Sequence, residues 1–368
     1  MKHLSIVIPT RNRPDYLKYA LESAIHQDSE SFEIIVSDNS TDRKSELVVK
    51  RLESNRIAYY RTGGHLSMSK NWEFAVSKAK GLFVCIIGDD DAVMPFFVSR
   101  VIALHEKFEP DVICWKKHVY IWPCGNNKGR VDFLASKGKD THYSVKDKIK
   151  SVLKMGGSSL HTIPMIYHSA VKRTLLDKIF KDSCGSLFPV TQPDVYNGFT
   201  VAANNPKIIQ SGEALSISGW SPTSNSGSMR ENYNSSTLKG YIKMSDFRPH
   251  STLLDMDEMR FFNSTPDAIL RAMDCYPEFF KGMSFNYSAM WALFNRLSGY
   301  RFTFWILSNS SKISNVHRFK VSTFIFFLVL NILNSLRLSI KKKFKLKLKF
   351  KDDLRNISNF IDFLVRRY

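Results

Sequence analysis

Short apolar runs alternate with longer periodic segments over the first hundred residues of the chain. The apolar runs are LSIVIP (residues 4–9), EIIVSD (33–38), RIAYYR (56–61) and LFVCIIG (82–88). Such runs are typical of strands that are buried on both faces of a sheet. The segments between them, 14–27, 42–54 and 69–81, repeat apolar residues at helical spacing. This alternation predicts an α/β protein with a Rossmann-like, mostly parallel sheet flanked by helices.

Polar residues follow three of the runs at the point where each run ends. They are Thr10, Arg11, Asn12 and Arg13 after the first, Asp38, Asn39 and Ser40 at the second, and Asp89, Asp90 and Asp91 after the fourth. Ligands of parallel sheets bind outside the carboxyl ends of the strands. Adjacent carboxylates repel one another, and a divalent cation would relieve this repulsion while neutralising a bound diphosphate. The aspartates are therefore predicted metal ligands, with a solvated turn as the alternative.

Composition and charge narrow the classes of protein. No GxGxxG or GxxxxGK[ST] pattern follows the first run, so a dinucleotide or P-loop site has no support. The five cysteines are scattered and form no CxxC pair, which argues against a disulfide framework or structural zinc and favours the cytoplasm. The net charge of +19 favours polyanionic partners such as nucleic acid, anionic lipid or sugar diphosphates.

Three motifs occur in a recognisable order. They are SIVIPTRNRPDYLKYALESAIHQ, EIIVSDNSTD and SMSKNWEFAVSKAKGLFVCIIGDDDAVMP. Together they resemble the family 2 glycosyltransferases up to about residue 105. The resemblance implies a GT-A fold and an inverting, metal-dependent enzyme that uses a nucleotide-sugar, with a UDP-linked sugar as the expected donor. The expected acceptor is a hydroxyl of a glycan or lipid-linked glycan in bacterial surface polysaccharide synthesis.

The donor site combines strand-end residues with positions that match the family. These residues are Pro9, Thr10, Asn12, Arg13, Asp38, Asn71, Asp89 and Asp90. By the resemblance, Pro9, Thr10 and Asn12 would line the base and ribose, and Asp38 would accept a hydrogen bond from a uracil-type base. Asn71 matches the family's asparagine ahead of the strand that carries the DxD element.

The same resemblance implies that Asp89 and Asp91 hold Mn²⁺ or Mg²⁺ against the donor diphosphate. Many family members read Asp-Ser-Asp-Asp where this chain reads Gly88-Asp89-Asp90-Asp91. This departure leaves open which two carboxylates bind the metal.

The expected general base lies in LFPVTQPDVYNGFTVAA (187–203). Asp194 follows a proline that suits a first helical turn, so helix capping is the alternative role for its carboxylate. Asp182 and Glu213 are weaker candidates for the base. His161 and His168 flank an apolar segment without a spaced partner, and we expect them to be structural or to contact the acceptor, not to bind metal.

Three units are expected along the chain. Residues 1–225 form the catalytic domain, with nucleotide-sugar binding at 1–105 and the acceptor and base region at 106–225. Residues 216–236 are predicted to be a loop, either a linker or a lid that closes through Trp220 and Arg230. Residues 226–315 form a helical accessory segment, in which Thr265 and Pro266 are expected to begin a helix.

Residues 316–368 form an apolar and polybasic tail. The apolar stretch 321–336 contains two asparagines and is shorter than the roughly 20 residues that cross a bilayer. Residues 337–351 add eight basic residues and no acid. This pattern predicts a peripheral enzyme on the cytoplasmic face of the cell membrane, bound to anionic lipid through its tail. The alternative is a helix that packs on the catalytic domain or on another subunit of a homo-oligomer.

Two other functions compete with the glycosyltransferase interpretation. A metal-dependent nucleotidyltransferase could use the same sheet and aspartates. A nucleic-acid-binding protein would explain the charge, but it predicts basic residues interleaved with aromatic ones across one face. Because the densest basic run lies at the C-terminus beside an apolar segment, no nucleic-acid partner is expected.

Overall fold

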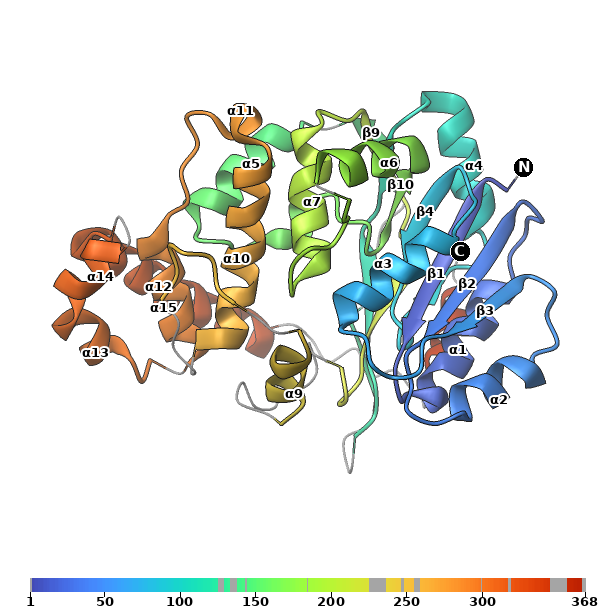
Figure 1. The fold of residues 1–368 in the computed structure, drawn as a ribbon. Helices are drawn as coiled ribbons and strands as arrows, with labels where there is room; N and C mark the ends of the chain where they lie inside the picture. The colour runs from blue at the N-terminus through green and yellow to red at the C-terminus, as the bar shows by residue number, and fades with distance from the viewer. Residues whose placement is uncertain are drawn as a thin grey trace.

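An eight-stranded sheet lies at the centre of the computed structural model, with helices on both faces (Figure 1). The structure describes the chain except residues 1, 125–128, 133–137, 143, 184, 225–235, 246–247, 255–258, 299, 317–318, 345–355 and 366–368. The strand order is β3-β2-β1-β4-β10-β6-β11-β9. The strands are β1 (Leu4–Thr10), β2 (Phe32–Asp38), β3 (Ile57–Arg61), β4 (Phe83–Ile86), β6 (Val112–Cys114), β9 (Thr141–His142), β10 (Ser169–Lys172) and β11 (Ile208–Gln210).

The predicted fold class is confirmed. Strands β3, β2, β1 and β4 are parallel, and β10 runs antiparallel between β4 and β6. β1, β2 and β4 are almost entirely buried, as their apolar runs predict. The prediction that residues 56–61 are buried on both faces is wrong, because β3 lies at the edge of the sheet and its residues are half-buried or exposed.

Both faces of the sheet carry a hydrophobic core, which explains the unbroken apolar runs. Along β1, Ile6 and Ile8 pack in a cluster with α1 (Pro14–Ile25) and α4 (Phe97–Phe108), whereas Val7 points into the opposite cluster. That opposite cluster contains α3 (Met68–Lys78), α5 (Val145–Lys154), α6 (Arg173–Asp182) and α7 (Pro193–Ala203). Helix α2 (Lys44–Arg51) lies beside α1.

A second sheet has the strand order β5-β12-β7-β8. Its strands are β5 (Ala92–Val93), β7 (Lys117–Ile121), β8 (Arg130–Asp132) and β12 (Ser216–Trp220). The prediction of a loop from residue 216 is therefore wrong at its start, because β12 buries Ile217 between two neighbouring strands. Gly219 is required there, since a Cβ at this position would overlap the carbonyl oxygen of Asp90. Arg230, the other lid candidate, lies outside the described residues.

Beyond β12, the regular structure of the described residues is helical. The helices are α9 (Ser236–Met244), α10 (Arg260–Cys275), α11 (Pro277–Phe280), α12 (Tyr287–Leu297), α13 (Thr303–Ser308), α14 (Ser310–Val316), α15 (Val321–Phe344) and α16 (Ile357–Val365). Figure 1 shows α10 to α15 in the half of the molecule opposite β3. Helix α16 returns to the second sheet, where Ile357 and Ile361 pack in a cluster with Tyr120 and Trp122.

Two helix boundaries differ from the sequence prediction. α10 begins at Arg260, so Thr265 does not start it and Pro266 lies inside it. Pro266 has no backbone N–H, so α10 lacks the hydrogen bond that this residue would donate to the carbonyl of Phe262. Phe262 is itself buried. α15 continues past residue 336 to Phe344.

Candidate active site

The three aspartates of residues 89–91 follow β4 and are buried, and each has its own partners. Asp91 is enclosed by donors. Its Oδ1 accepts the Gly219 N–H at 2.7 Å, and its Oδ2 accepts the Gly88 N–H and the Tyr167 hydroxyl, each at 2.6 Å. Nε2 of His168 lies 3.0 Å from the same Oδ2. A carboxylate offers about four acceptor positions, so the protein itself occupies those of Asp91.

Asp89 and Asp90 share the guanidinium of Arg13. Oδ2 of Asp89 accepts the Thr10 hydroxyl at 2.6 Å and Nε of Arg13 at 3.1 Å, and Arg13 also forms an ion pair with Oδ1. Nη1 of Arg13 lies 3.5 Å from Oδ2 of Asp90. That oxygen also accepts the backbone N–H and the hydroxyl of Ser221, at 3.0 and 2.6 Å. Among the described residues, none donates a hydrogen bond to Oδ1 of Asp90.

The electrostatics separate Asp91 from its two neighbours. Burial raises the pKa of Asp89 to about 6 and also raises that of Asp90, although the Arg13 guanidinium opposes both shifts. For Asp91, burial is outweighed by His168 and by the hydrogen bonds that it accepts, which hold its pKa at about 2. The hydrogen-bond donors around Asp91 thus stabilise its ionised form, whereas burial disfavours the ionised forms of Asp89 and Asp90.

A divalent cation would stabilise the ionised forms of Asp89 and Asp90. Hard carboxylate oxygens are the ligands that Mg²⁺ and Mn²⁺ prefer, and Oδ1 of Asp90 is open. Across the part of the chain that the structure describes, no three His, Cys, Asp or Glu side chains form a ready cation cage. The site therefore offers excess negative charge and a free oxygen instead of a closed set of ligands.

His168 connects Asp91 to the second sheet. It has a left-handed backbone (φ 59°), and its Nδ1 lies 2.8 Å from the hydroxyl oxygen of Ser216. Nε1 of Trp115 donates to the same oxygen at 2.7 Å. His168 is thus buried with partners at both ring nitrogens, as expected of a structural histidine. His161 is exposed on a short 3₁₀ turn.

Asp194 lies in the first turn of α7, directly after the proline that begins the helix. Its Oδ1 is buried and accepts no hydrogen bond from the described residues. Burial raises the pKa of Asp194, and the ammonium of Lys117 opposes this shift. Lys117 extends from β7, and its Nζ lies 5.6 Å from the centroid of the Tyr167 ring. Asp194 is therefore a desolvated carboxylate with a cation nearby and a free oxygen.

Lys117 and Tyr167 also belong to the site, although no sequence motif identifies them and the sequence analysis does not predict them. Burial lowers the pKa of Lys117, while the charges of Asp91 and Asp194 oppose the shift. Tyr167 follows the HTIP segment, and its hydroxyl reaches Asp91. The alternating pattern of residues 117–121 could have indicated Lys117, because it predicts a strand in which that side chain lies on the opposite face from buried His118.

The remaining predicted donor residues lie at the same edge of the sheet but bond to the protein. Both oxygens of Asp38 are used, since they accept the Ser40 N–H at 2.8 Å and the Tyr59 hydroxyl at 2.6 Å. Oδ1 of Asn71 accepts the hydroxyl of Ser37, which connects α3 to β2.

Asn12 and Pro9 complete this edge. Oδ1 of Asn12 accepts the Thr41 N–H at 2.9 Å, so its side chain closes the loop after β2. Pro9 is a buried residue of β1. Thr10, Arg13, Asp89 and Asp90 are thus the predicted donor residues that the fold gathers in one cluster.

The two weaker candidates for the base lie away from this cluster. Glu213 pairs with Nε of Arg100 at 2.8 Å. Asp182 is exposed at the end of α6, where Tyr276 lies 3.4 Å from its Oδ2. Neither carboxylate has a described contact with residues 89–91.

Residues 5–175 match the family described as Glycosyl transferase family 2. A GalNAc(5)-diNAcBac-PP-undecaprenol beta-1,3-glucosyltransferase of Campylobacter jejuni is 33% identical over 104 residues, which cover 27% of this chain and 34% of the relative. The abequosyltransferase RfbV of Salmonella typhimurium is 39% identical over 95 residues, or 24% of this chain and 28% of the relative. The chain therefore spans about a third of the length of these curated relatives.

The chain also matches two solved structures over most of its length. TarS residues 1–349 of S. aureus in complex with UDP-GlcNAc has a TM-score of 0.48 and 18% identity, and the match covers 81% of each chain. The mannosyltransferase PcManGT of Pyrobaculum calidifontis in complex with GDP-Man and Mn²⁺ has a TM-score of 0.43 and 14% identity, covering 91% of this chain and 88% of that one.

Proposed function

Residues 5–175 match glycosyl transferase family 2, and on this match we propose that the chain moves a sugar from a nucleotide-sugar donor to a hydroxyl of a glycan or lipid-linked glycan. The proposal includes a UDP-linked donor and a place in bacterial surface polysaccharide synthesis. One relative supports the acceptor class, since it is a glucosyltransferase named for GalNAc(5)-diNAcBac-PP-undecaprenol.

One observation carries the reaction: Oδ1 of Asp194 is buried and accepts no hydrogen bond from the described residues, while the charge of Lys117 acts on the same carboxylate. Asp194 would take the proton of the acceptor hydroxyl, whose oxygen then attacks the anomeric carbon in line. The bond between that carbon and the diphosphate oxygen breaks, and its electron pair leaves with the nucleotide diphosphate. Attack from the side opposite the leaving group inverts the anomeric configuration, through an oxocarbenium-like transition state. The raised pKa of Asp194 makes it a stronger base than an exposed aspartate.

Arg13 and the aspartates would serve the donor diphosphate. Oδ1 of Asp90 accepts no hydrogen bond from the described residues, and burial raises the pKa of both Asp89 and Asp90. These features favour Asp89 and Asp90 as the residues that hold Mn²⁺ or Mg²⁺, in place of the expected pair with Asp91. A bound divalent cation would neutralise the diphosphate as it leaves. Asp91 instead positions the turn through its four contacts.

In the same proposal, Asp38, Asn12 and Asn71 hold the loops around the nucleotide in position and do not bind the donor themselves. Their polar atoms already hold the loops after β1 and β2 in place. A nucleotide base would then lie against loops that these residues fix, while Thr10 and Arg13 contact the aspartate turn directly.

The remaining parts of the proposal concern organisation and location. We divide the chain into a catalytic domain (1–225), a helical accessory segment (226–315) and a membrane-associating tail (316–368). Within the described residues, every helix is too short or too polar to cross a membrane. We place the enzyme at the cytoplasmic face of the cell membrane because the tail joins an apolar helix to a polybasic run.

A panel of nucleotide-sugars with Mn²⁺ tests the reaction. The expected product is a nucleotide diphosphate, released faster in the presence of a glycan acceptor. Release of pyrophosphate from a nucleoside triphosphate would instead identify a nucleotidyltransferase. Asp182→Asn is a matched control for Asp194→Asn, because Asp182 is an exposed carboxylate outside the site.

A further inference from the structure

Helix α15 has two apolar sides, and the described residues of the chain cover one of them. Phe324 and Phe327 are buried on the side that packs against α12. The exposed apolar residues, with their exposed fractions, are Val321 (38%), Ile325 (45%), Phe326 (61%), Val329 (49%), Ile332 (40%) and Leu333 (57%). At about 100° per residue, these six fall within roughly 140° of the helix circumference. The exposed apolar residues therefore form one continuous stripe.

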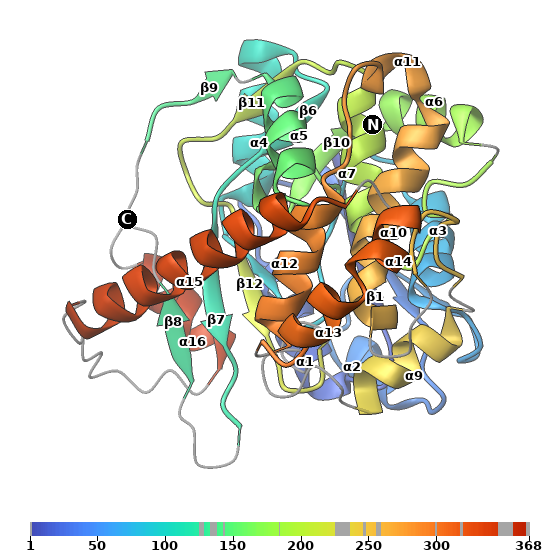
Figure 2. The same ribbon diagram turned by 90° about the vertical axis from the view of Figure 1, so that its left-hand side faces the viewer.

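Helix α13 adds three more exposed apolar side chains. They are Phe304 (82%), Trp305 (36%) and Leu307 (38%). Figure 2 shows α13, α14 and α15 on the side of the molecule that faces the viewer, with α15 in front of α12. We call the stripe of α15 together with these three residues the apolar face. Clustered exposed apolar side chains, as in the stripe of α15, mark sites of protein or membrane interaction.

The chain around the apolar face is strongly basic. Residues 279–351 contain fourteen Lys and Arg and no Asp or Glu. Lys312 and Lys320, on either side of residues 313–319, are both exposed. This segment therefore supplies most of the excess positive charge of the protein.

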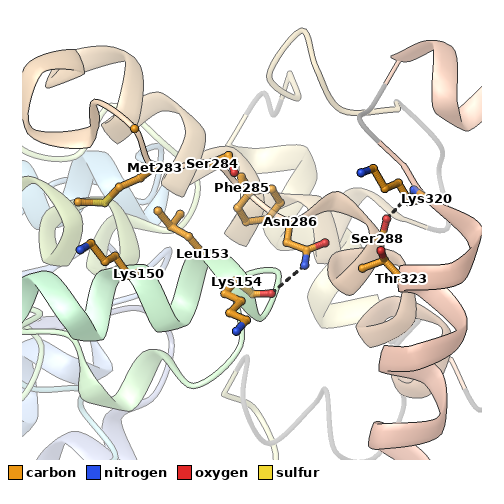
Figure 3. A pocket seen from close by; sticks show the side chains of 11 residues that line it. Lys150, Leu153, Lys154, Met283, Ser284, Phe285, Asn286, Ser288, Lys320 and Thr323 are labelled. Atoms are coloured by element: carbon orange, nitrogen blue, oxygen red, sulfur yellow. Dashed lines mark hydrogen bonds between the residues drawn. The ribbon is translucent and has the colours of Figure 1, made fainter.

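A lysine-lined cavity of about 400 Å³ opens at the N-terminal end of α15 (Figure 3). Lys150 and Lys154 line it from α5, and Lys320 lines it from the residue before α15. The cavity is fixed by two hydrogen bonds, from Nδ2 of Asn286 to the carbonyl of Lys154 at 3.0 Å and from the N–H of Lys320 to the hydroxyl of Ser288 at 2.8 Å. The ion pairs found among the described residues do not include these three ammonium groups. The cavity thus presents unneutralised positive charge beside an apolar surface.

We propose that the apolar face docks on a bilayer that contains anionic phospholipid, and that the Lys150, Lys154 and Lys320 cavity takes the phosphate of a lipid headgroup. The apolar side chains would enter the boundary between headgroups and acyl chains, where Trp305 and Phe304 are favourable residues. Charge selects this occupant over a second copy of the chain. A symmetric dimer through this face would bring the same acid-free, basic segment against itself, whereas an anionic surface neutralises it.

The docking surface extends the proposed membrane location and is independent of the chemistry at Asp194. It assigns the contact to described parts of α5, α13 and α15 in addition to the basic run at 337–351. Transfer to a soluble acceptor would therefore survive its loss, so a failure of this inference is distinguishable from a failure of the proposed reaction.

The test is co-sedimentation of the full-length protein with vesicles. Vesicles of phosphatidylcholine with phosphatidylglycerol should bind it, and vesicles of phosphatidylcholine alone should bind it far less. Phe304→Ser with Phe326→Ser should weaken binding at least tenfold, whereas Leu47→Ser, an exposed leucine on α2, should not. Lys150→Gln with Lys154→Gln should weaken binding about tenfold or more, and Lys178→Gln with Lys181→Gln on α6 is the charge-matched control.

Thermal unfolding and light scattering complete the experiment. Unfolding temperatures equal to that of the wild type show that the variants fold, since every substituted side chain is exposed. Absence of binding to anionic vesicles at low salt would overturn the proposal. So would a dimer in solution that dissociates on Phe326→Ser, because the apolar face would then be an interface between copies of the chain.

Discussion

The Tyr167 hydroxyl donates a 2.6 Å hydrogen bond to Oδ2 of Asp91. The same ring lies 5.6 Å from the ammonium of Lys117. One tyrosine therefore contacts both the aspartate turn after β4 and the ammonium whose charge acts on Asp194. This relationship separates the roles of the three aspartates and suggests which substitutions affect stability and which affect catalysis.

Asp194→Asn should reduce turnover by about 100-fold or more, because an amide keeps the shape of the side chain but cannot accept the acceptor's proton. Donor binding should remain close to that of the wild type. Nucleotide diphosphate release measures the first effect, and donor-induced thermal stabilisation measures the second. If the variant turns over like the wild type, the base is another residue.

Asp90→Ala and Asp89→Ala should each abolish the dependence of donor binding on Mn²⁺, because they remove carboxylate oxygens from the proposed cation site. Chelation of the cation with EDTA should have the same effect on the wild type. Thermal stabilisation by a nucleotide-sugar, with and without Mn²⁺, is the measurement. Unchanged cation dependence in both variants would remove these residues from the metal site.

Asp91→Ala should act chiefly on stability. It leaves His168, Tyr167 and two backbone N–H groups buried without their acceptor, at a cost of about 3 kcal/mol. Urea unfolding gives the free energy of unfolding. A variant as stable as the wild type that no longer binds the cation would return Asp91 to the list of ligands.

Tyr167→Phe removes the hydroxyl alone and should reduce the free energy of unfolding by about 2 kcal/mol, as for a hydrogen bond to a charged group. Tyr16→Phe is the control, since Tyr16 is also partly buried and its ring packs against Trp122. Equal losses in the two variants would show that the bond to Asp91 contributes nothing of its own.

The acid limb of the pH profile should report on Asp194. The base must be ionised, so kcat/KM should fall as the pH decreases through its raised pKa, above the ordinary value for an aspartate. Lys117 from β7 lowers this pKa, whereas Tyr241 from α9 and Tyr167 carry no charge near neutral pH. Lys117→Met should therefore move the limb to higher pH, and Lys117→Arg should restore it. An unmoved limb in Lys117→Met would disconnect the two residues.

The sequence by itself determined the parts of the molecule that depend on local pattern. Strands covered on both faces must be apolar throughout, so the runs at 4–9, 33–38 and 82–88 predicted β1, β2 and β4 and the edge at which the aspartates lie. Pro14 and Pro193 marked the first turns of α1 and α7 because their fixed backbone angle suits that position. The carboxyl ends of parallel strands lie at one edge of the sheet, so the sequence also predicted that Thr10, Arg13 and the aspartates lie close together.

Tertiary structure alone decided what each of these residues does. Asp89, Asp90 and Asp91 are the same residue type and adjacent in the sequence. Their hydrogen bonds and pKa values differ because the donors around them come from segments far along the chain. Gly219, which bonds to Asp91, is 128 residues away from it, and Ser221 is 131 residues from Asp90. Periodicity reports local burial and carries no information on such long-range pairs. The same limit explains why the sequence predicts a loop at residues 216–220. The small residues of this segment are typical of loops, but here they allow the strand to approach the aspartate turn closely, and only the fold creates that contact.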